Sequence, residues 1–140
     1  MNRPVLIAGC VGFALLVGAT SIVLAETLLA TSTTAMAITG DVEMDDFSMV
    51  FADGTRLDFD ELVGDSFVVD GETVNASVYS VAAPMDPVLL NGNRLCGSGP
   101  VTYVASWGAD SDVAVAVFDT QDIPGSDADM CALYYYTYPN

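Results

Sequence analysis

The chain has 140 residues, the length of a single domain, and 52% of them are hydrophobic. Its 19 acidic residues outnumber three arginines, and with no lysine or histidine the formal net charge is -16. This charge excludes a nucleic-acid-binding protein and disfavours binding to an anionic membrane surface, because both kinds of binding depend on lysine and arginine. The hydrophobic content excludes a disordered acidic chain, which would need low hydrophobicity.

Composition also argues against catalysis. Without histidine the chain lacks the usual general base and the commonest transition-metal ligand, and without lysine it lacks Schiff-base chemistry. It contains no nucleophile elbow, no phosphate-binding loop and no dinucleotide-binding fingerprint. We therefore predict a protein that is not an enzyme and holds no cofactor.

The first 37 residues have the pattern of a secretory leader. An apolar, uncharged run covers residues 5–25 and is expected to be helical. Small-residue cleavage sites end at Ala37, within Ala35-Met36-Ala37, and at Ala25. The prediction is a signal peptide over residues 1–37, cleaved after Ala37 or after Ala25. An uncleaved membrane anchor over residues 5–25 is the alternative, since the run is long enough to span a bilayer.

Short strands separated by turn signals follow, which indicates a single β domain over residues 38–140. Strands are expected at residues 47–51 and 56–59, joined by "ADGT", with "DELVG" (60–64) as a helical turn. "SFVVDGETVNASVYSV" (66–81) predicts a hairpin, because Asp70-Gly71 supplies the positive φ angles that tight hairpins need. A short strand at residues 88–90 is expected before the turn at 91–93.

The last third of the chain predicts three more strands, at residues 101–107, 113–119 and 131–138. Val113, Val115 and Val117 alternate with Ala114, Ala116 and Phe118, so both faces of the middle strand are apolar and it is expected to be central. The pattern as a whole predicts an all-β fold, a small antiparallel sandwich or barrel of about six to eight short strands.

Cys96 and Cys131 are the two cysteines downstream of the leader. In an exported chain such a pair predicts a disulfide bond. The bond would close a loop of about 36 residues and stabilise the fold by about 3.5–4 kcal/mol in the chain-entropy model.

Aspartates and glutamates gather in the loops, where their carboxylates would be suitable ligands for Ca²⁺. No spacing matches a known calcium loop, so a solvated acidic surface is the favoured interpretation and a calcium site the alternative. The residues concerned are Asp41, Glu43, Asp45, Asp46, Asp58, Asp60, Glu61, Asp110, Asp112, Asp119, Asp122, Asp127 and Asp129.

The closing sequence "CALYYYTYPN" holds four of the six tyrosines. Strand alternation places Tyr134, Tyr136 and Tyr138 on one face and Tyr135 on the other. The three tyrosines form a tentative binding face for a saccharide or peptide, because tyrosine is enriched at binding surfaces. Packing in the core of a small β domain is the favoured alternative.

Together these patterns predict an exported, non-catalytic accessory or binding protein of the periplasm or cell surface. Its expected partner is an envelope protein or a saccharide. Contact with a membrane is expected only through residues 5–25, if they are not cleaved. Three alternatives stay open: a membrane-tethered form of the same domain, a secreted inhibitor that presents residues 96–100 to a protease, and a small carboxylate-based enzyme.

Overall fold

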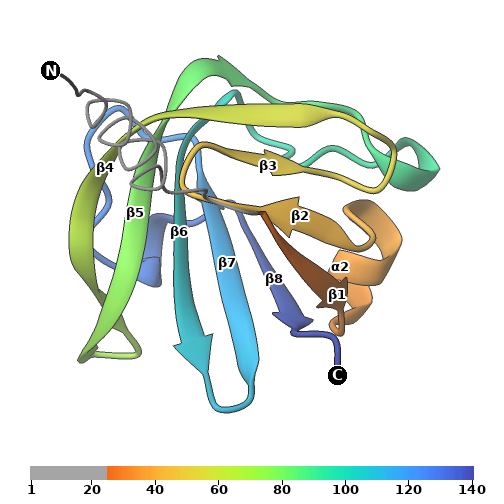
Figure 1. The fold of residues 1–140 in the computed structure, drawn as a ribbon. Helices are drawn as coiled ribbons and strands as arrows, with labels where there is room; N and C mark the ends of the chain where they lie inside the picture. The colour runs from red at the N-terminus through yellow and green to blue at the C-terminus, as the bar shows by residue number, and fades with distance from the viewer. Residues whose placement is uncertain (1–24) are drawn as a thin grey trace, which may run out of the picture.

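The computed structural model describes residues 25–140, which form a closed barrel of eight antiparallel strands. Each strand pairs with the next along the chain, and the last pairs with the first (Figure 1). The all-β, antiparallel prediction is confirmed, and the architecture is a barrel. The predicted leader helix lies outside the described residues, except for Ala25. The strands are β1 (Glu26–Ala30), β2 (Val42–Met44), β3 (Ser48–Val50), β4 (Arg56–Val69), β5 (Glu72–Met85), β6 (Val101–Ala109), β7 (Asp112–Phe118) and β8 (Ala132–Thr137).

One short α-helix, α2 (Thr33–Ile38), follows β1 directly. Ser32 caps its N-terminus by accepting a hydrogen bond from the backbone N–H of Ala35 at 3.1 Å. The same Ser32 hydroxyl accepts from the N–H of Tyr135 in β8, so the cap also ties the helix to the barrel. Two 3₁₀ turns complete the structure, η1 (Leu90–Gly92) and η2 (Asp127–Asp129). Within residues 25–140 no helix is long and apolar enough to cross a membrane.

The central position of β7 is confirmed. It pairs with β6 on one side and β8 on the other, and every residue from Val113 to Phe118 is buried. Val113, Val115 and Val117 belong to one hydrophobic cluster, and the alternate residues belong to another. Because successive side chains point to opposite faces of the sheet, β7 contributes to two separate hydrophobic cores.

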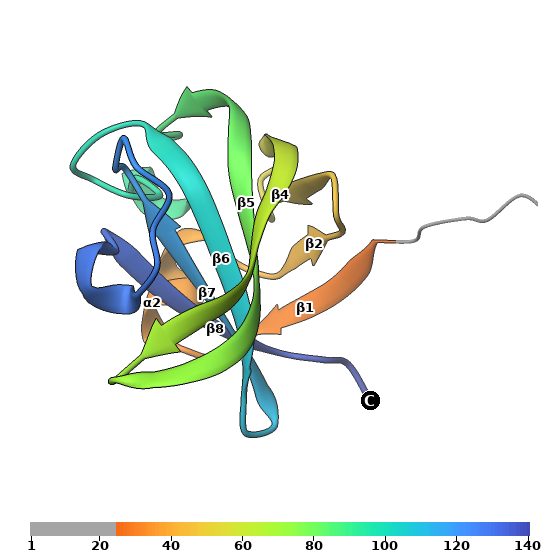
Figure 2. The same ribbon diagram turned by 90° about the vertical axis from the view of Figure 1, so that its left-hand side faces the viewer.

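The first core fills the barrel interior and the second lies on the outer face of the long strands. In the outer cluster Phe67, near the end of β4, packs against Trp107 and Phe118, with ring centroids 5.3 and 5.8 Å away. The β4–β5 hairpin is long and strongly curved (Figure 2), and its Val68 N–H donates to the carbonyl of Gly125 in the segment before η2. The buried interior residues include Leu28, Val42, Met49, Leu57, Val104, Val115, Tyr134 and Tyr136.

The predicted hairpin at residues 66–81 is confirmed as the outer half of the β4–β5 pair. Asp70 and Gly71 form its turn with φ angles of 51° and 83°, the left-handed values that mirror-image turns require. The β6–β7 turn likewise has Asp110 at φ 58°.

Two local predictions are wrong. Residues 60–64 are not a helical turn but the middle of β4, where several register shifts interrupt its pairing with β5. At these irregularities the alternation of apolar and polar residues, from which a strand is predicted, is interrupted. Residues 88–90 are not a strand, because only Val88 makes a bridge, to Arg94, and η1 begins at Leu90.

The domain extends upstream of Ile38. β1 pairs with β2 through Glu26–Met44 and with β8 through Ala30–Tyr136, so it is the strand that closes the barrel. A chain that began at Ile38 would lack β1 and nearly all of α2. Cleavage after Ala25, by contrast, would leave every strand intact.

Candidate functional site

The two ends of the barrel differ. At one end Thr39, just after α2, hydrogen bonds through Oγ1 to the hydroxyl of Tyr136 at 2.7 Å. Leu95 is fully buried near this end, and its carbonyl accepts a hydrogen bond from the hydroxyl of Tyr134. The helix and the loop around Leu95 therefore close this end.

The other end holds a cavity of about 250 Å³. It lies where β1 begins, where β2 ends and where β7 begins, since Leu28, Met44 and Val113 form its apolar wall. In an antiparallel barrel these three positions meet at one mouth. The cavity opens beside Glu26 and Tyr138, both exposed to solvent.

Three carboxylates line this mouth cavity: Glu26 at the start of β1, and Asp45 and Asp46 in the β2–β3 turn. Oδ1 of Asp45 accepts from the backbone N–H groups of Phe47 and Ser48 at 2.7 and 2.9 Å. These two bonds fix the turn that presents both aspartates at the mouth.

Tyr79 of β5 is held in the cavity wall by a hydrogen bond and by ring stacking. Its hydroxyl donates to Oδ1 of Asp46 at 2.7 Å, and its ring stacks on Phe59 with centroids 4.6 Å apart. Burial, together with the bond to Asp46, raises the pKa of Tyr79 to about 12. The hydroxyl is therefore protonated at every physiological pH. Two further hydroxyls, of Ser77 and Ser106, line the wall.

No residue that lines the cavity carries a positive charge. Of the arginines in the described part of the chain, Arg56 pairs with Asp58 at 2.6 Å, with both side chains more than half exposed. Arg94 donates to the backbone carbonyl of Asp86. The carboxylates of the mouth thus have no cationic partner among the residues that line the cavity with them.

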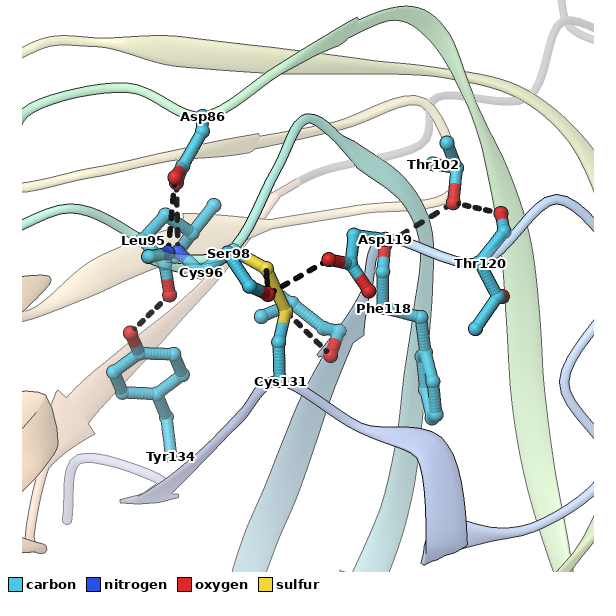
Figure 3. The surroundings of a disulfide bond; sticks show 12 residues. Asp86, Leu95, Cys96, Ser98, Thr102, Phe118, Asp119, Thr120, Cys131 and Tyr134 are labelled. Atoms are coloured by element: carbon cyan, nitrogen blue, oxygen red, sulfur yellow. Dashed lines mark hydrogen bonds between the residues drawn. A yellow bond between two sulfur atoms is a disulfide. The ribbon is translucent and has the colours of Figure 1, made fainter.

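The disulfide between Cys96 and Cys131 is confirmed, with an S–S distance of 2.04 Å and Cα atoms 5.3 Å apart. The carboxylate of Asp86 accepts from the N–H of Cys96 at 2.7 Å and of Gly97 at 2.9 Å (Figure 3). The hydroxyl of Ser98 donates to Asp119 at 2.7 Å. The loop at residues 96–100 is therefore held by one covalent bond and by two carboxylates.

The terminal tyrosines occupy different environments. Tyr134 and Tyr136 face the interior with side chains fully buried, whereas Tyr138 follows the end of β8 and is 50% exposed. Burial raises the pKa of Tyr134 to about 12 and that of Tyr136 further still. The three residues do not form one exposed surface. Only Tyr138 reaches a cavity, at the rim of the mouth.

In the described part of the chain, the acidic residues named above do not form a group of three carboxylate oxygens within 4.8 Å of each other. Among residues 25–140 the one group of three ligand atoms within 4.8 Å of each other belongs to Cys96, Asp119 and Cys131. The two sulfur atoms of this group are joined in the disulfide, so neither is a thiolate that can ligate a metal.

The mouth cavity was missed by sequence reasoning. Asp45 and Asp46 were noticed only as members of an acidic cluster, and Glu26 was assigned to the leader. For Tyr79 the sequence indicates only that the residue lies in a predicted strand. The convergence of these residues depends on barrel closure, which joins β1 to strands far along the chain. Comparison of the chain with protein-family models, curated proteins and solved structures found no match.

Proposed function

We propose that this protein is an exported, non-catalytic binding protein that receives a small ligand in the mouth cavity of its barrel. The observation that carries the proposal is the cavity of about 250 Å³ at one end of a barrel whose other end is closed. Eight-stranded barrels have an interior that is either filled by side chains or holds one small ligand. Here the closed end is filled, and the space lies at the mouth.

Two features support a location outside the cytoplasm. The Cys96–Cys131 disulfide suggests an oxidising compartment, because cytosolic thiols are kept reduced. The apolar run of the predicted leader ends at Ala25, directly before the first residue of β1. We infer that the leader is cleaved after Ala25. Of the two predicted cleavage sites, this is the one that leaves β1 in the mature chain.

The chemistry of the mouth supports a non-catalytic role. Its polar groups are three carboxylates and several hydroxyls, and Asp46 is already engaged by Tyr79. No histidine, lysine or free thiol lines the cavity, so catalysis there would depend on the carboxylates, the basis of the alternative carboxylate-based enzyme. Such a set is suited to holding a ligand in place.

Native mass spectrometry of the protein isolated from the envelope of its own cells tests the proposal. The wild-type protein and Ser106→Ala should retain a small molecule, while Ser106→Leu should lose it, because the larger leucine side chain would fill part of the cavity that Ser106 lines. The alanine variant is the matched control, since it removes the same hydroxyl without filling the cavity. Equal retention by the leucine and alanine variants would contradict a ligand in the mouth.

A second candidate function is inhibition of a protease by the loop at residues 96–100. The clamping of this loop by the disulfide, Asp86 and Asp119 favours it, because rigid loops lose little entropy on binding. Gly97 and Ser98 at its centre are exposed. Failure to inhibit representative serine and cysteine proteases at micromolar concentration would remove this candidate.

A further inference from the structure

We propose that the mouth cavity selects a small molecule that carries a positively charged amine on an apolar body. This inference rests on the proposed function and assigns the chemical class of the ligand. It follows from three properties of the cavity: the absence of a cationic side chain among its lining residues, the carboxylate oxygens that accept no hydrogen bond from the described residues, and its apolar wall.

The carboxylates of the mouth are positioned for an ammonium group. Within the described part of the chain, the hydrogen bonds to the side chains of Asp45 and Asp46 all end on Oδ1. Oδ2 of each residue accepts no hydrogen bond from the described residues and is available to a ligand donor. An ammonium group provides three N–H donors, and hydrogen bonds between charged partners are the strong ones.

The apolar wall requires more than a bare ion. Leu28, Met44 and Val113 are buried side chains that face the cavity, and Tyr138 lies at its rim with an aromatic ring. A short apolar body would cover the small area that these three side chains leave exposed, and the tyrosine ring attracts cations through its face. The volume equals that of about eight water molecules, which suits a ligand smaller than a typical drug.

A metal ion fits the same residues poorly. Ca²⁺ and Mg²⁺ need several oxygen ligands around one point. Among residues 25–140, the one group of three ligand atoms within 4.8 Å of one another belongs to Cys96, Asp119 and Cys131. The carboxylate oxygens of Glu26, Asp45 and Asp46 therefore do not form such a group. Separated carboxylates around an apolar wall match an organic cation better.

Isothermal titration at pH 7 with three probes of nearly equal shape tests the inference: benzylamine, benzyl alcohol and benzoate. We expect benzylamine to bind about tenfold or more tightly than benzyl alcohol, and benzoate not to bind. Asp46→Asn should weaken benzylamine binding by about tenfold and leave the alcohol unchanged. Asp122→Asn is the matched control, because it removes the same charge from the exposed loop after β7 and should leave both affinities unchanged.

The outcomes separate the two proposals. Equal affinities of benzylamine and benzyl alcohol, or equal effects of Asp46→Asn and Asp122→Asn, would overturn the selection for a cation while leaving a cavity that binds ligands. If none of the three probes binds and Ser106→Leu retains the native small molecule, the proposed function itself fails.

Discussion

Tyr134, Tyr136 and Tyr138 lie close together in the sequence, but the first two are buried and the third is exposed. Their rings are fully buried in the barrel, and their hydroxyls bond to the Leu95 carbonyl and to Thr39. Tyr138, two positions on, is half exposed. A buried tyrosine contributes apolar area and also needs a partner for its hydroxyl, and both needs are met here.

Truncation of these tyrosines should therefore have unequal effects on stability. Tyr134→Ala removes a buried ring and leaves a cavity, which should lower the free energy of unfolding by about 3–5 kcal/mol. Tyr138→Ala should change it by no more than about 0.5 kcal/mol, as for most surface residues. Urea unfolding monitored by circular dichroism measures both, and equal losses would contradict the burial described here.

The buried tyrosines also predict a loss of stability in alkali. The pKa values of Tyr79 and Tyr134 are raised to about 12, and that of Tyr136 lies higher still, mainly through burial. Their stabilising contribution is fully present below pH 10, the pKa of an unfolded tyrosine, and declines as the pH rises toward 12. Urea unfolding at pH 8, 10 and 11 should show this decline. Tyr79→Phe should make it shallower, and an unchanged pH dependence in that variant would count against the account.

At the scale of elements, the disulfide links the loop after η1 to the residue before β8. The neighbouring Tyr134–Leu95 hydrogen bond joins the same two regions, so both contacts anchor β8 at the closed end. Neither Cys96 nor Cys131 lines the mouth cavity, so binding there involves no direct contact with the disulfide.

The double substitution Cys96→Ser with Cys131→Ser should lower the free energy of unfolding by about 3.5–4 kcal/mol, because the unfolded chain regains loop entropy. Denaturant titration of the variant beside the oxidised wild type measures the change. Reduction of the wild type is the control and should reproduce it. A loss below about 1 kcal/mol would show that the closed loop constrains the unfolded chain little.

β1 is the element on which closure depends. N-terminal sequencing of the exported protein should begin at Glu26, because removal of β1 would expose the edges of β2 and β8 to solvent. A chain begun at Ile38 should aggregate or fail to show a cooperative thermal transition, whereas one begun at Glu26 should fold. A mature protein that begins at Ile38 and unfolds cooperatively would contradict the closed barrel.

Much of this element order is predictable from sequence, and the exceptions have physical causes. The β6–β7–β8 meander has clear alternation and turn residues, so its strands were assigned correctly. β1 and α2 were not recognised, because the small residues that form Ser32–Ile38 also resemble a cleavage site. The irregular middle of β4 lacks alternation. No local pattern predicts the mouth cavity, which arises from contacts between distant strands.

Residues 25–140 form a barrel that α2 and the loop around Leu95 close at one end; α2 lies on the side away from the start of β1 (Figure 2). The mouth cavity lies at the other end. The net charge of the chain is -16, and a charge of this size opposes self-association. At the mouth the same negative charge adjoins an apolar wall.

The central claim is that a ligand binds in the mouth, and NMR titration of the ¹⁵N-labelled protein with benzylamine tests it most directly. The account predicts that shifted amide signals gather around Ser77, Ser106 and Val113, which line the cavity, and that Ser106→Leu abolishes the shifts. Shifts that gather instead at residues 96–100, or that persist in Ser106→Leu, would contradict it.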